Sequence, residues 1–120
     1  MLADADSDTR RAYGRNMPSQ AEFEHADLIA RTLRAVAHPL RVLALRAFTR
    51  GDLSPIDLVR KLGPPHDLGI VAYHVRRLAA AGIVELSETI PRRGAVEHRY
   101  ALTCKGAALA SAIDGLELDS

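Results

Sequence analysis

The 120-residue sequence predicts a mainly α domain that carries a small β-hairpin. Up to residue 82, successive segments repeat apolar residues at spacings of three and four, as helices do. Between residues 83 and 102 the period changes to alternation, and a last helical segment follows. The predicted order is therefore helix, helix, helix, helix, strand, strand, helix. Residues 1–20 are polar and show no period, so we expect a flexible arm ahead of one domain at 21–117.

The first helix is expected from about Ser19 to Ala37. Ser19 suits the N-cap, and Glu22 stands three residues later, where it can close a capping box. The apolar face is broad enough to pack on the core of the domain and also on a second subunit. Its residues are Phe23, Ala26, Ile29, Ala30, Leu33, Val36 and Ala37.

Proline and glycine mark the next two helices. Pro39 can open the second helix, where its missing N–H is harmless, and Gly51 can stop it. Ser54 is a suitable cap for the third helix, Pro55 takes its first position, and the run 63–65 (Gly-Pro-Pro) ends it. The predicted buried stripe of the second helix consists of Leu40, Leu43, Ala44, Ala47 and Phe48.

The fourth helix is predicted at about 67–81. Leu68, Val71, Val75 and Leu78 recur on one face, which we expect to be buried. Such a helix is suited to contact an anionic partner through the residues that we expect to face solvent. These are Ile70, Tyr73, His74, Arg76 and Arg77, with Arg77 expected on the more outward side.

The alternating segments 83–90 and 96–102 predict two antiparallel strands joined by residues 91–95. Gly94 permits a tight turn, so Arg92 and Arg93 should lie at its tip. We expect Val84, Leu86, Glu88 and Ile90 to share one face of the first strand, and Val96, His98, Tyr100 and Leu102 one face of the second. The last helix should be capped by Thr103 and carry Leu109, Ile113 and Leu116 on one side.

The charge is unevenly distributed along the chain. Residues 28–105 hold 13 Lys and Arg against 6 Asp and Glu, whereas both ends are acidic. A basic middle is expected of a domain that meets phosphates, although a solvated surface has the same composition. A single cysteine fits a reducing compartment, and no apolar run approaches the roughly 20 residues of a membrane span. We therefore expect a cytoplasmic protein that is not bound to a membrane.

The third helix, a turn and the fourth helix form a helix-turn-helix, and the hairpin forms a wing. The segments HPLRVLALRAF, SPIDLVRKLG, VAYHVRRLAAAGIVEL and PRRGAVEHRYALT resemble winged helix-turn-helix transcriptional regulators of the ArsR-like kind, over about residues 24 to 113. The resemblance implies a regulator that binds double-stranded DNA, usually as a homodimer formed by the first and last helices. Many relatives carry small polar residues where this chain has Ile70 and Ala72, so phosphate contacts are better supported than base readout.

Two sets of site residues follow from pattern and resemblance together. For DNA binding we predict Ile70, Tyr73, His74, Arg76, Arg77, Arg92, Arg93 and, more weakly, Arg99. For dimerisation we predict Phe23, Ala26, Ile29, Ala30, Leu33, Leu109, Ile113 and Leu116. The expected function is repression at a pseudo-palindromic site. The alternative is a winged-helix module that binds protein, which Ile70 and Ala72 favour.

The sequence offers no constellation for other chemistry. Its five histidines are dispersed, and the single cysteine has no partner for a Cys-x-Cys metal motif, so we expect no metal site and no cofactor. Catalytic motifs are absent, so we expect no enzyme activity. Cys104 is expected to be a small packing residue, and a thiol redox switch stays open as an alternative. The sequence does not identify a small-molecule effector.

Overall fold

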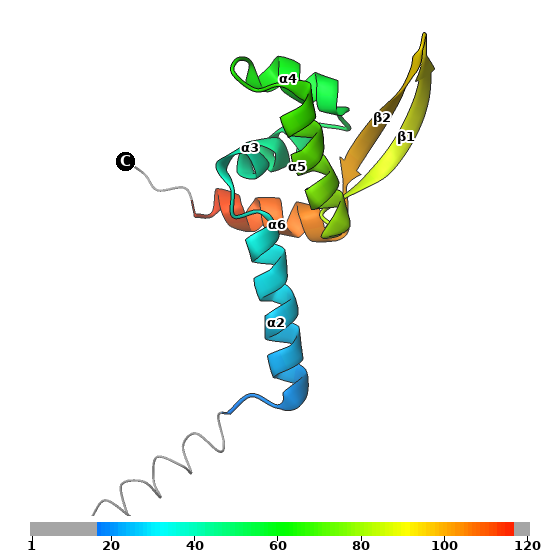
Figure 1. Ribbon diagram of the computed structural model, residues 1–120. Helices are drawn as coiled ribbons and strands as arrows, with labels where there is room; N and C mark the ends of the chain where they lie inside the picture. The colour runs from blue at the N-terminus through cyan, green and yellow to red at the C-terminus, as the bar shows by residue number, and fades with distance from the viewer. Residues whose placement is uncertain (1–16, 117–120) are drawn as a thin grey trace, which may run out of the picture. The chain divides into compact units, whose positions relative to one another are not determined.

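The computed structural model describes residues 17–116, and Figure 1 shows the arrangement. Most of the predicted N-terminal arm lies outside these residues. The helices and strands are α2 (Gln20–Ala35), α3 (Pro39–Phe48), α4 (Pro55–Leu62), α5 (Leu68–Ala80), β1 (Val84–Arg92), β2 (Ala95–Leu102) and α6 (Cys104–Asp114). This order confirms the predicted fold class. The chain divides into two compact units, and the boundary between them lies inside α2, between Ala30 and Arg31.

Local side-chain caps begin most of the helices where the sequence predicts. The Oγ of Ser19 accepts a hydrogen bond from the Glu22 N–H at 3.2 Å, and the Glu22 carboxylate accepts one from the Ser19 N–H at 2.7 Å. Ser54 and Asp57 form the same reciprocal capping box at α4. Two caps were not predicted. The Nδ1 of His38 accepts a hydrogen bond from the Leu40 N–H at 3.1 Å and begins α3, and the Asp67 carboxylate caps α5.

The second unit begins at Arg31. Its core lies where α3, α4, α5 and α6 meet the start of β1. Because this core contains little aromatic area, it depends on close aliphatic packing. Its fully buried members include Leu45, Leu58, Val71, Val75, Leu78, Ile83 and Val84. No described helix is long and apolar enough to cross a membrane.

Two predicted core residues are exposed instead. Leu43 is exposed because α3 directs Leu40, Ala44 and Leu45 inward, and Leu43 lies off this face. Leu68 is exposed because it is the first residue of α5, where no turn of the same helix precedes it. The helical period of α3 and α5 was therefore predicted correctly, but the exposure of Leu43 and Leu68 was not.

The hairpin of β1 and β2 extends from the end of α5 and the start of α6 (Figure 1). Glycine at position 94 has φ 74°, the left-handed conformation that the two-residue turn needs, so the prediction for Gly94 is confirmed. A bulge interrupts β1 between Leu86 and Glu88. The predicted single face of β1 is therefore wrong, because the extra residue turns Glu88 and Ile90 to the face opposite Leu86.

A short backbone bridge attaches the wing to the helices, and the sequence pattern did not predict it. Leu53 and Tyr100 exchange both backbone hydrogen bonds, at 3.0 and 2.9 Å. Leu53 directly precedes Ser54, the cap of α4. The base of the wing is therefore held against the start of the helix-turn-helix.

Candidate nucleic-acid interface

A groove of about 530 Å³ lies between α5 and the wing. On the helix side its lining residues Leu68, Ala72 and Arg76 are spaced by four, so they form one row along α5. On the wing side Arg92, Val96 and His98 line it. The structure thus brings Arg76 and Arg92, which are 16 positions apart in the sequence, to a common concave surface.

The tip of the wing carries the two predicted arginines in different settings. The Nε of Arg92 lies 3.1 Å from the Glu97 carboxylate across the hairpin, and its side chain remains 58% exposed. Arg93 is exposed in the turn and has no ion pair within residues 17–116. Arg92 is held in place by its neighbour, whereas Arg93 is available to an incoming anion.

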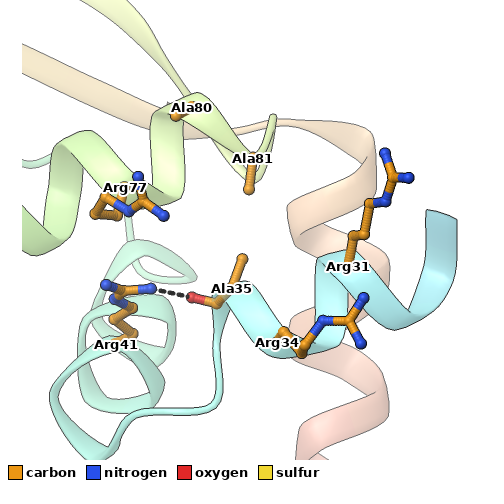
Figure 2. A pocket seen from close by; sticks show the side chains of 7 residues that line it. All are labelled: Arg31, Arg34, Ala35, Arg41, Arg77, Ala80 and Ala81. Atoms are coloured by element: carbon orange, nitrogen blue, oxygen red, sulfur yellow. Dashed lines mark hydrogen bonds between the residues drawn. The ribbon is translucent and has the colours of Figure 1, made fainter. Parts of the chain in front are cut away.

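A second row on α5 consists of Ile70, Tyr73 and Arg77. Ile70 and Tyr73 are each 50% exposed, so both reach solvent as predicted. The N–H of Ile70 donates to the Asp67 carboxylate at 2.9 Å, which fixes the start of the helix. Arg77 is exposed but does not line the wing groove; it lines a separate pocket with arginines of α2 and α3 (Figure 2).

The expectation that His74 faces solvent is wrong. Only 7% of this residue is exposed, and its Nδ1 accepts a hydrogen bond from the Nε of Arg41 at 2.8 Å. Its ring also lies 4.3 Å from that of His38, centroid to centroid. Burial, together with the charges of His38 and Arg41, lowers the pKa of His74 below its usual value. His74 therefore links α5 to α3 and is not placed to touch a ligand.

Arg99 was predicted, more weakly, as a DNA contact on the outward face of β2, but its guanidinium is engaged within the chain. It donates to the Asp57 carboxylate at 2.9 Å, to Glu97 at 3.2 Å and to the Asp52 carbonyl at 2.7 Å. The hydrogen bond to Glu97 and the charge of Asp57 raise the pKa of Arg99 further, although burial opposes this. Arg99 thus joins the wing to the start of α4 and is a positioning residue.

The predicted dimerisation residues divide into exposed and buried sets. On α2, Phe23, Ile29 and Leu33 are each about half exposed, and Ala26 is exposed, whereas Ala30 is partly buried. Leu109 is buried in the core, so its assignment to a second subunit is wrong: α6 uses this side chain to pack on its own chain. Ile113 is partly buried against the same core, and Leu116 is exposed beyond the end of α6.

Cys104 was expected to pack inside the protein, but it is exposed at the first position of α6. The cap residue Thr103 precedes it, and the interior is reached instead by Gly106, Leu109 and Ala110. Among residues 17–116, no three His, Cys, Asp or Glu side chains gather in a way that could hold a metal ion.

No protein-family model and no curated protein matches this sequence. Solved structures do match. The transcriptional repressor BigR from Xylella fastidiosa is 24% identical, with a TM-score of 0.62 over 82% of this chain and 92% of its own. Reduced HlyU from Vibrio cholerae is 20% identical, with a TM-score of 0.67 over 84% of this chain and 100% of its own. A MarR-family transcriptional regulator from Enterococcus faecalis is 18% identical, with a TM-score of 0.64 over 83% and 84%. BigR is described as a transcriptional repressor and the Enterococcus faecalis protein as a transcriptional regulator. The likeness of all three structures shows that this chain has the winged helix-turn-helix fold.

Proposed function

We propose that this protein is a transcriptional regulator, of the ArsR-like kind, that binds double-stranded DNA. The observation that carries the proposal is the groove that both Arg76 of α5 and Arg92 of the wing line. Two guanidiniums on a concave surface suit the phosphates that flank a major groove. Helix α5 follows a short turn and precedes a hairpin, as a recognition helix does. The winged helix-turn-helix fold supports this role for α5.

In this arrangement α5 would enter the major groove and the wing would lie on the adjacent backbone. Ile70 offers an apolar contact for a thymine methyl, and the Tyr73 hydroxyl can donate to a phosphate. Arg93 at the turn reaches furthest along the wing and suits a phosphate or a narrow minor groove. Phosphate contacts would supply most of the affinity, because few polar side chains on α5 can read base edges.

We further propose that the regulator acts as a cytoplasmic homodimer and represses transcription. Phe23, Ile29 and Leu33 expose an apolar stripe on α2, a surface that a second copy of the chain can cover. A two-fold dimer would read two half-sites about 34 Å apart, one helical turn of DNA. Repression is favoured by the BigR likeness, since that protein is described as a transcriptional repressor.

The test begins with selection of bound sequences from a random double-stranded pool, followed by fluorescence anisotropy over a range of salt concentrations. Arg76→Ala should weaken binding by about tenfold, the value of one charge-assisted contact, and the double variant Arg92→Ala/Arg93→Ala should weaken it by more than tenfold. Each lost phosphate contact should also reduce the slope of log affinity against log salt by about 1. Arg50→Ala is the matched control, because Arg50 is exposed and does not line the groove.

Circular dichroism of each variant separates loss of binding from loss of folding. If both groove variants bind selected DNA as the parent does, the groove is not the interface. If the parent shows no salt-dependent binding to any DNA, the proposal fails and a module that binds protein through Ile70 and its neighbours is favoured. Analytical ultracentrifugation of Leu33→Glu tests the dimer, which should dissociate.

A further inference from the structure

A second pocket, of about 320 Å³, lies beside the C-terminal half of α5 and shares no lining residue with the wing groove. Figure 2 shows Arg41 and Arg77 on one side of it and Arg31 and Arg34 on the other, with Ala35 and Ala81 between. Its volume is at the lower end of the range for small-molecule sites, about 300 to 1,000 Å³. Four arginine side chains from three helices therefore line a space of ligand size.

Apart from its four arginines, the pocket is lined only by alanines, which carry no charge. The side chains of Arg34 and Arg77 make no hydrogen bond or ion pair with any other residue in the described part of the chain. Arg41 is held rigidly by contrast. Its Nε donates to His74 and its Nη1 donates to the Ala35 carbonyl, both at 2.8 Å. Both of its acceptors are uncharged, so its positive charge is not cancelled.

Gathering Arg34, Arg41 and Arg77 around one pocket has an electrostatic cost. A guanidinium stays protonated at every physiological pH, so the repulsion cannot be relieved by loss of a proton. At physiological salt the screening length is about 8 Å, so salt does not fully screen the repulsion between guanidiniums around one pocket. An anion with two or more charges would replace repulsion by attraction, and planar guanidiniums bind carboxylate or phosphate oxygens in pairs.

We propose that this arginine pocket, lined by Arg31, Arg34, Arg41 and Arg77, binds a small multivalent oxyanion of the phosphorylated or polycarboxylate class. The oxygens would lie on the guanidiniums, and a small apolar body could rest on Ala35, Ala80 and Ala81. The pocket is separate from the wing groove because consecutive residues on a helix point about 100° apart. Arg76 faces the wing, whereas Arg77 faces the pocket.

The proposal is tested with the full chain, without DNA, by isothermal titration calorimetry at about 0.15 M salt. Pyrophosphate and citrate serve as the two probes. Saturable binding of either, one per chain, is expected. Arg34→Gln and Arg77→Gln should each weaken it by about tenfold, as expected for loss of one charge-assisted contact. Arg50→Gln removes an equal charge from an exposed site outside the pocket and should change the affinity by less than about twofold.

Amide chemical shifts of the parent protein locate the site without any variant. On addition of the probe that binds, the N–H signals of Ala35, Ala80 and Ala81 should move more than those of the wing. Binding of pyrophosphate alone supports a phosphorylated ligand, and binding of citrate alone supports a polycarboxylate. No saturable binding of either probe, equal loss in Arg50→Gln, or shifts confined to the wing overturns the proposal. Because DNA is absent, each of these outcomes is independent of the proposed regulatory function.

Discussion

Replacing Gly106 by alanine tests how closely α6 packs on the start of the wing. A Cβ at this position would lie 2.0 Å from the Ile83 carbonyl oxygen and 3.0 Å from a methyl of Leu102. That oxygen is backbone and already accepts hydrogen bonds from the N–H and the hydroxyl of Thr103, both at 3.1 Å. Helix α6 would therefore have to move away from Ile83 by on the order of 1 Å to restore ordinary contact.

The expected magnitude combines three effects. Overpacking costs roughly 1–3 kcal/mol, and weakening the hydrogen bonds to Ile83 adds about 1 kcal/mol. Alanine regains about 1 kcal/mol because it is the better helix former. We expect Gly106→Ala to lower the free energy of unfolding by about 2 kcal/mol, which lowers the urea midpoint by on the order of 1 M.

The assay is urea unfolding followed by circular dichroism at equilibrium. Gly69→Ala is the matched control, because the nearest atom to its new Cβ, a carboxylate oxygen of Asp67, lies at 3.4 Å. This control should unfold at the parent's midpoint or slightly above it, since it gains helix propensity without a clash. A Gly106→Ala protein as stable as the parent would show that α6 does not need the close approach, and the packing argument would be refuted.

Two further predictions concern pH. Burial alone would raise the pKa of Asp57, but hydrogen bonds from Ser54 and the charge of Arg99 outweigh it, so the pKa lies below its usual value. The stability that ionised Asp57 contributes is complete above the unfolded pKa of about 3.9 and is lost as the pH falls through the lower folded pKa. In urea unfolding at acid pH, the stability of Asp57→Asn should therefore fall less steeply with decreasing pH than that of the parent. The pKa of His74 is lowered mainly by burial. The stability that neutral His74 contributes is therefore complete above the unfolded pKa of about 6.5, and it declines as the pH falls from there to the lower folded pKa. His74→Gln should lack this decline in urea midpoints measured between about pH 5 and 7, and an identical decline in both proteins would contradict the assignment.

Features whose partners lie within one helical turn or one hairpin could be predicted from the sequence. Ser54 caps α4 through an N–H three residues away, and Gly94 supplies the left-handed turn without any distant contact. Thr103 begins α6 in the same local way. Caps, turns and the change of period between residues 82 and 84 were therefore sufficient to predict the order of elements and the winged helix-turn-helix.

Only the tertiary structure shows which of the polar side chains that the sequence pattern places on the surface are free to bind a ligand. His74 and Arg99 have the polarity of ligand-binding residues, but their partners Arg41 and Asp57 lie 33 and 42 positions away, so helical and strand periods could not place them. The same holds for Arg76 and Arg77, which are adjacent in sequence yet line different cavities. A helical period fixes the angle between two side chains, whereas only the packing of α3 and the wing against α5 decides what each one meets.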